Sequence, residues 1–220
     1  MEKEIRITGT GHCSIAPDAV SVRYSIVSRN SDYKEAMKLA KSRQQKASKA
    51  LVAAGIPKND ITTSDFSVSS EKKEIEKYGV RKYIFDCYAV HHSFEVVFDL
   101  NMNLLEKVIS GIAASCSDPN LSIRFFVKDA GKVRSMLLAS AAKDAHSSAN
   151  VLCDSLGVKL GELISINYSW SEFDIYSKTS YRACEEISGA CSAPEITPSD
   201  INLSDTATFV WAIGEKTNSK

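Results

Sequence analysis

Hydrophobic and polar residues alternate strictly in the second half of the stretch from Tyr83 to Leu100. One side of an extended chain would carry Tyr88, Val90, His92, Phe94, Val96, Phe98 and Leu100. The other side would carry Ala89, His91, Ser93, Glu95, Val97 and Asp99. A period of two with aromatic and β-branched residues is typical of a half-buried strand. The length of this run predicts a strand at the middle of a sheet, with helices on its apolar face.

Three other segments repeat apolar residues at helical spacing instead. The first begins at an N-cap supplied by Ser31-Asp32 and ends at Gly55, before Pro57. The second is capped by Asn101 or Asn103, and the third runs from about Ala130 to Leu156 and is rich in alanine. We therefore expect three amphipathic helices.

The remaining alternating stretches predict further strands near residues 4–8, 20–26, 66–68, 121–127, 164–170 and 201–213. Because these stretches alternate rather than form continuous apolar runs, the sheet should be mainly antiparallel and covered on one face only. The predicted fold class is α+β, with the three helices packed on one face of the sheet. The residues expected to be buried are Phe94, Val96, Phe98, Phe125, Ile166 and Trp211, with Leu51, Ile109 and Leu152 packed against them.

Between two of these strands lies the charged segment EKKEIEKYGVRK, which centres on Tyr78-Gly79. This pattern predicts a β-hairpin whose tip is too polar for a core and therefore projects from the body. The hairpin has two interpretations: a solvated loop, or an arm that reaches a partner. Ile75 and Tyr78 are apolar residues near the tip, and they are candidate interaction residues.

The stretch 171–200 shows no clean period and forms a long irregular insertion in what otherwise reads as a single domain, residues 1–220. Long irregular segments in compact domains are usually functional or disordered. Tyr176 and Tyr181 are further candidate interaction residues there. Cys184 and Cys191 are close enough in sequence to form a disulfide in an exported protein, and the sequence leaves that pairing open.

Charge and cysteine content limit the kinds of partner that we expect and indicate a cellular compartment. Lysine plus arginine equals aspartate plus glutamate, at 27 each, so nothing indicates a nucleic-acid partner. No apolar run is long enough for a membrane span, and no signal-peptide core is visible. Six cysteines without a CxxC pair favour the reducing cytoplasm, with export as the alternative if a leader has been removed. Cys87, Cys116 and Cys153 are expected to be unreactive in the folded protein.

Candidate chemical groups are few, and none forms a recognised constellation. His91 and His92 point to opposite sides of one strand, so they cannot chelate one metal together. His12-Cys13 lacks a third residue that would orient a catalytic dyad. Gly9-x-Gly11 precedes a strand rather than a helix, so it is not a phosphate loop. We expect no cofactor, no metal and no catalytic residue.

Three motifs resemble those of a known family. GTGHCSIAPDAVSV fits a G-x-G…PD motif, and GIPKNDITTSDFSV fits G-I-x-x-x-D-I-x-T-x-x-F-x-V. AAKDAHSSANVLCDSLGVKLGELISI fits A-x-x-D-A-x-x-x-A-x-x-L-x-x-x-L-G-V-x-L-G. In this order they resemble the SIMPL-domain family over roughly Ile5 to Ile213. That family includes bacterial envelope proteins linked to oxidative-stress defence, a periplasmic immunogen that forms ring-like oligomers, and a mammalian adaptor that binds a pelle-like kinase.

The resemblance implies a domain without an established reaction, with a role related to the envelope or to stress. Two function classes follow. The first is a non-enzymatic binding or assembly protein that forms a homo-oligomer or contacts a protein partner through strand edges, the hairpin and the insertion. The second is an enzyme whose site is assembled around Cys13 or the 171–200 stretch.

Overall fold

The structure is a computed structural model that describes residues 3–77, 80–115, 120–169, 175–183 and 196–215. The chain divides into two compact units. Unit 1 combines residues 1–17, 127–177 and 199–220, and unit 2 combines residues 18–126 and 178–198. The chain therefore passes from one unit to the other at four points in the sequence.

Unit 2 is built on a five-stranded sheet with the order β3-β4-β2-β5-β7. Its elements are β2 (Ala19–Asn30), α1 (Tyr33–Ala54), the 3-10 helix η1 (Lys58–Asp60), β3 (Ile61–Lys77), β4 (Val80–Asp99), α2 (Met102–Ser115), β5 (Asn120–Phe126) and β7 (Tyr176–Ala183). β2 pairs antiparallel with both β4 and β5, and β3 pairs antiparallel with β4. The stretch that we expected at the middle of a sheet is thus the interior strand β4, and β2 has the middle position.

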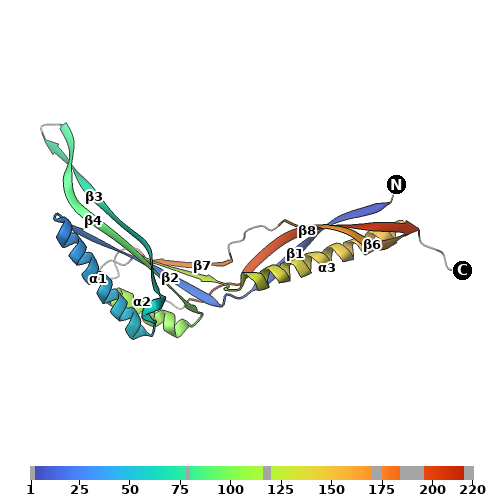
Figure 1. The fold of residues 1–220 in the computed structure, drawn as a ribbon, viewed down its shortest axis with the longest axis horizontal. Helices are drawn as coiled ribbons and strands as arrows, with labels where there is room; N and C mark the ends of the chain where they lie inside the picture. The colour runs from blue at the N-terminus through green and yellow to red at the C-terminus, as the bar shows by residue number, and fades with distance from the viewer. Residues whose placement is uncertain (1–2, 78–79, 116–119, 170–174, 184–195, 216–220) are drawn as a thin grey trace. The chain divides into compact units, whose positions relative to one another are not determined.

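Helices α1 and α2 cover one face of this sheet (Figure 1). Leu51 of α1 and Leu105 of α2 are fully buried against Tyr24 of β2 and Phe94 of β4. Burial of this apolar layer is the main stabilising contribution to the unit. The caps of α1 are those that the sequence predicts: the Asp32 side chain accepts from the Glu35 N–H, and Gly55 has a φ of 112°.

Unit 1 is built on a three-stranded antiparallel sheet with the order β1-β8-β6. Its elements are β1 (Glu4–Ile15), α3 (Ala130–Leu156), β6 (Val158–Asn167) and β8 (Ile201–Glu215). Helix α3 packs on one face of this sheet through residues spaced four apart, which are Val133, Leu137, Ala141, Ala145, Ala149 and Cys153. Phe209 and Trp211 of β8 complete this core, and their rings stack with centroids 5.6 Å apart.

The structure confirms the α+β class, with three α-helices and antiparallel sheets in the part of the chain that it describes. It corrects the expectation of one sheet, because two sheets form and the helices are divided between them. It also places a strand, β7, inside the stretch that the sequence suggested was irregular. Phe94, Val96, Phe125, Trp211, Leu51 and Ile109 are buried as expected.

Three burial predictions were inaccurate or wrong. Ile166 is 56% exposed because β6 is an edge strand, and α3 lies mainly over β1 and β8. Leu152 is 43% exposed because it lies beside, rather than on, the four-residue stripe by which α3 contacts the sheet. Phe98 is only half-buried.

Candidate interaction surfaces

The arm, defined here as residues 70–77 of β3 and 80–88 of β4, is the far end of the β3–β4 hairpin (Figure 1). The two strands pair from Ile61 opposite Val96 to Lys77 opposite Val80. The register shifts between Glu71, which faces Cys87, and Lys72, which faces Phe85. Asp86 is the extra residue of this β-bulge. One extra residue reverses the side to which all following side chains point.

The bulge places Tyr83 and Phe85 on the same face of the arm as Tyr88. The ring of Tyr88 lies 5.6 Å from that of Tyr33 at the start of α1 and 5.1 Å from that of Phe85. Phe85 is 47% exposed and Tyr83 is 69% exposed, since α1 begins beside Tyr88 and leaves the rest of this face bare. An aromatic stripe therefore runs from the body of unit 2 onto the open arm.

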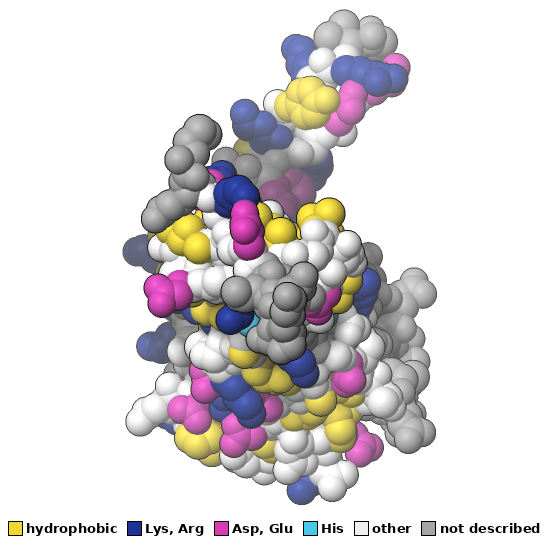
Figure 2. Space-filling view, turned by 90° about the vertical axis from the view of Figure 1, so that its right-hand side faces the viewer, with side chains coloured by type: hydrophobic (Ala, Val, Ile, Leu, Met, Phe, Trp, Pro, Cys, Tyr) yellow, Lys and Arg dark blue, Asp and Glu magenta, His cyan; other side chains and the backbone are white. Residues whose placement is uncertain are grey.

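Charged side chains of both signs surround this stripe. Arg81 pairs with Glu74 at 3.5 Å on the face of the stripe, whereas Lys73, which pairs with Asp86 at 2.9 Å, lies opposite Ile84 on the other face. Figure 2 shows the projecting arm as hydrophobic side chains set between Lys or Arg and Asp or Glu side chains. Such exposed ion pairs contribute little to stability, but they make the rim of the stripe polar.

A polar cluster fixes the opposite face of the arm at its base. Arg29 of β2 donates to both carboxylate oxygens of Glu71, at 2.8 and 3.1 Å. The hydrogen bond from Arg29 lowers the pKa of Glu71. The Cys87 thiol donates to Glu71 at 3.6 Å, and burial together with this carboxylate raises the pKa of Cys87. A thiol with a raised pKa is a poor nucleophile at neutral pH, so this cluster is structural.

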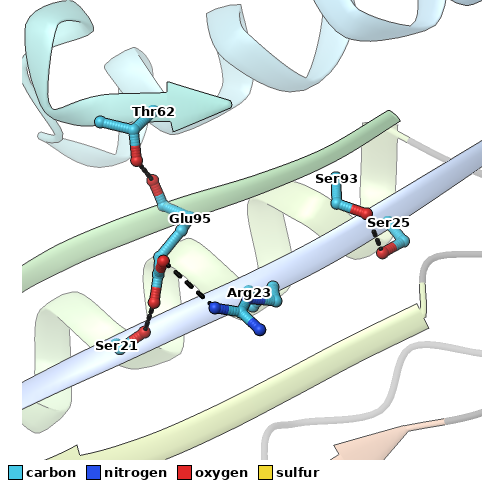
Figure 3. Close-up of polar contacts among 6 residues, drawn as sticks. All are labelled: Ser21, Arg23, Ser25, Thr62, Ser93 and Glu95. Carbon is cyan, nitrogen blue, oxygen red and sulfur yellow. Dashed lines mark hydrogen bonds and ion pairs between the residues drawn. The ribbon is translucent and has the colours of Figure 1, made fainter. Parts of the chain in front are cut away.

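The side of the five-stranded sheet away from α1 and α2 is polar (Figure 3). Ser21 donates to Glu95 Oε1 at 2.6 Å, and Arg23 lies 3.4 Å from Glu95 Oε2. Ser25 and Ser93 share a hydrogen bond at 2.7 Å. These side chains satisfy one another across β2 and β4, so the face is a cross-strand polar ladder rather than a ligand site.

The structure describes only some of the side chains that the sequence predicts as interaction residues. Ile75 is half-buried on the face of the arm opposite Tyr83, because it pairs with Lys82. Tyr78 lies outside the described residues. Tyr176 is 43% exposed on β7, whereas the side chain of Tyr181 lies outside the described part.

Tyr83, Ile84 and Phe85 are the residues that sequence reasoning missed as interaction candidates. They are three consecutive apolar residues between charged Lys82 and Asp86, and all three are exposed. Three consecutive apolar residues interrupt the strict alternation of apolar and polar residues. This interruption was the feature of the sequence that could have indicated the bulge.

The catalytic candidates do not come together. Cys13 is buried in unit 1 against Val133 and Leu137, while the His12 side chain is exposed. The backbone N–H of His12 donates a hydrogen bond to Ser140 Oγ at 3.0 Å. This contact joins β1 to α3 and does not involve the imidazole ring. His92 is half-buried, with its ring 3.9 Å from that of Phe94 and 5.1 Å from that of Phe66. Burial lowers the pKa of His92, as expected for a histidine packed among aromatic rings.

The family-like motifs of β1 and α3 pack directly on each other within unit 1. A Cβ atom added to Gly9 would lie 2.2 Å from the Ala141 carbonyl oxygen, and one added to Gly11 would lie 2.1 Å from that of Leu137. Asp144 Oδ2 accepts a hydrogen bond from Thr10 N at 2.8 Å. Gly9 and Gly11 of the first motif and Asp144 of the third thus form one contact between β1 and α3. Their role in this contact is packing.

Within the described residues, no group of three or more His, Cys, Asp or Glu side chains could hold a metal ion. None of the described helices is long and apolar enough to cross a membrane. A shallow open pocket between α1 and α2 is lined by Ala50, Ala53, Ala54, Lys107, Ser110, Gly111, Ala114 and Ser115. The described residues of this lining include no His, Asp or Glu that could act as a general base for its serine hydroxyls.

The described residues form an α+β fold of two compact units, in which the residues of the β1 and α3 motifs make packing contacts. The chain belongs to the SIMPL family, described as a protein of unknown function (DUF541), which matches residues 5–211. No curated protein matches the chain.

Proposed function

We propose that this protein is a non-enzymatic binding and assembly protein whose arm contacts a second copy of the chain. The observation that carries the proposal is the bare end of the aromatic stripe, Tyr83 and Phe85, on a projecting hairpin. Exposed apolar patches rimmed by polar groups mark protein interaction sites, and aromatic residues are enriched in them. A free-standing hairpin gains nothing from keeping such residues in water.

The charges of the arm suit a second copy as the partner. The arm carries Lys72, Lys73, Arg81 and Lys82 beside Glu71, Glu74, Glu76 and Asp86, so its rim offers both signs at short spacing. A surface of mixed charge can complement itself across a two-fold axis. A strongly basic or strongly acidic partner would instead require side chains of a single, opposite charge on the arm.

Two pairs of substitutions test the arm. Tyr83→Ser with Phe85→Ser removes the stripe, and Ile75→Ser with Tyr78→Ser removes the apolar residues that the sequence indicates near the tip. Light scattering at high micromolar concentration should show an oligomer for the wild type and a lower mass for the first variant. Val151→Ser is the matched control, because Val151 is 62% exposed on α3 and lies away from the arm in sequence.

The thermal unfolding midpoint should remain unchanged in the Tyr83→Ser/Phe85→Ser variant, since both side chains are exposed. A wild type that is monomeric at this concentration would overturn the proposal. If only the Ile75→Ser/Tyr78→Ser variant had a lower mass, the contact would lie near the tip of the arm rather than at the aromatic stripe.

We further propose that residues 1–220 form one SIMPL domain with two structural units. The family match runs through both units, and the chain crosses between them at four points. Limited proteolysis tests this, because cleavage at one crossing should not release either unit intact. A role related to the envelope or to stress, implied by the resemblance, stays a prediction.

We retain the cytoplasm as the proposed location, with export as the alternative. The support is chemical: Cys13, Cys87 and Cys153 are free thiols, and two of them are buried. Free cysteines persist most readily in a reducing compartment. Fractionation of cells that produce the protein from its native gene separates the two locations.

The alternative function, an enzyme with a site around Cys13 or the 171–200 stretch, has less support. Cys13 is 6% exposed, and its neighbours Val127, Val133, Leu137 and Ile201 are apolar. Most of the 171–200 stretch lies outside the described residues. An accessible, rapidly alkylated Cys13 in the folded protein would revive this alternative.

A further inference from the structure

The two edges of the three-stranded sheet in unit 1 differ in protection. At the β1 edge, α3 supplies acceptors to outward-facing backbone N–H groups: Asp144 binds Thr10 N at 2.8 Å, and Ser140 binds His12 N at 3.0 Å. At the other edge lies β6, whose only neighbour in this sheet among the described residues is β8. An unpaired edge is a template for a strand from another chain.

β6 also exposes apolar side chains that an edge strand in water has no reason to keep. Leu163, Ile164 and Ile166 are 48%, 51% and 56% exposed. Leu163 pairs with Trp211 and Ile166 with Phe209, so both side chains lie on the face of the sheet that α3 covers elsewhere. The apolar layer under α3 therefore continues past α3 and ends uncovered.

We propose that the open edge of β6 pairs antiparallel with β6 of a second copy. This contact is separate from that of the arm and does not depend on it. A two-fold axis makes the partner surface identical, so the pairing must be self-complementary. The charges of β6 meet that requirement.

Consider a pairing whose two-fold axis lies at Leu160. The bulge between Leu160 and Leu163 brings Lys159 and Glu162 to one face of the strand, and Val158 and Leu163 to the other. It sets Lys159 of each copy opposite Glu162 of the other, which gives two opposite-charge cross-strand pairs. It also sets Val158 opposite Leu163 of the second copy. Beyond this paired stretch, Ile164 reaches the end of the second copy's α3, where Leu156 is 72% exposed.

The same register brings together two exposed apolar residues, Leu156 of one copy and Ile164 of the other. Leu156 and Ile164 have exposed apolar surface that no other described residue of the chain covers fully. The first register shift in β6, between Leu160 and Leu163, lies at the centre of this pairing, and the second, between Leu163 and Ser165, ends it. Bulges limit how far an edge can pair, so the contact is a dimer contact rather than a growing sheet.

Charge reversal provides the test, and it is made in the Tyr83→Ser/Phe85→Ser arm variant so that the arm cannot contribute. Sedimentation should show a dimer in this background. Lys159→Glu or Glu162→Lys alone should weaken dimerisation on the order of 10-fold, because each creates two like-charge pairs. The double variant Lys159→Glu/Glu162→Lys should restore it.

Lys143→Glu is the matched control, since Lys143 is an exposed lysine that belongs to α3 rather than to β6. Hydrogen exchange gives a second readout: the amides of β6 should gain protection as protein concentration rises. The pairing is overturned if the background variant is monomeric, if the single reversals leave the dimer unchanged, or if the double variant fails to restore it. Concentration-independent exchange of β6 would equally overturn it, and would leave a strand from a different protein as the occupant of this edge.

Discussion

Asp144 on α3 holds the edge of β1 by accepting a hydrogen bond from the backbone of Thr10 at 2.8 Å. The contact is possible because Gly9 and Gly11, on either side of Thr10, let the helix backbone approach. Residues of two separate sequence motifs therefore meet in one packing interaction. The glycine and carboxylate residues of these motifs thus have a packing role in this chain.

Replacing Gly9 by alanine should destabilise the protein strongly. The new Cβ would lie 2.2 Å from the Ala141 carbonyl oxygen and 2.7 Å from the Ala145 Cβ, so α3 would have to move. Overpacking of this kind costs about 1–3 kcal/mol or more. Urea denaturation measures the loss, and Gly214→Ala in β8 is the matched control because nothing lies within 4 Å of its added Cβ. Equal effects of the two substitutions would contradict the close-packing interpretation.

Buried hydroxyl groups in unit 2 provide a second prediction. Ser28 Oγ is fully buried and has no hydrogen-bond partner among the described residues, whereas Ser21 Oγ donates to Glu95 at 2.6 Å. Ser28→Ala should therefore leave the free energy of unfolding unchanged or raise it. Ser21→Ala should lower it by about 1 kcal/mol or more, because an acceptor carboxylate loses its donor. The same denaturation experiment on both variants decides the point, and a larger loss for Ser28→Ala would show that its hydroxyl is bonded after all.

Local signals in the sequence predicted local structure well. Asp32 and Gly55 bound α1 as their types require, and the period of two identified β4. Alternation reports that one face of a strand is buried, but not which strands are neighbours. The pairing of β1 with β8 joins the two ends of the chain, and no local pattern could have separated that sheet from the other.

The same limit explains the errors at single residues. Ile166 alternates like a core residue, yet β6 is an edge that α3 does not reach. On the arm, uninterrupted alternation places Ile84 on the face of Tyr88, and the bulge at Asp86 places Tyr83 and Phe85 there instead. A single extra residue thus decided which side chains form the candidate surface.

The Cys87 thiol gives a third prediction. Burial and the adjacent Glu71 raise its pKa, so alkylation at neutral pH should be slower than that of a free cysteine although the residue is only half-buried. Glu71→Gln should increase the rate at Cys87 and shift the alkylation profile to lower pH, because a negative charge is removed and Arg29 remains. Peptide mass spectrometry follows Cys87 separately from the other thiols. Glu74→Gln, on the other face of the arm, is the control and should leave the rate at Cys87 unchanged.

His92 makes the stability of unit 2 depend on pH. Burial lowers its pKa below the ordinary value of 6.5, since the ring packs between Phe66 and Phe94 with Thr63 Oγ1 at 3.4 Å. Above about pH 7.5 the imidazole is neutral in both the folded and the unfolded chain, so it contributes no pH dependence. Below about 6.5 the unfolded chain binds a proton that the folded chain resists, and stability falls as pH falls.

The substitution His92→Gln should therefore reduce the loss of stability between pH 7.5 and 5.5, because glutamine remains uncharged. Urea denaturation at the two pH values, for the wild type and the variant, measures the difference. Between pH 7.5 and 8.5 the two proteins should show the same pH dependence, which serves as the internal control. An identical loss at pH 5.5 in both proteins would show that His92 is protonated as easily in the folded chain as in the unfolded one. The aromatic packing around its ring would then not exclude the charge.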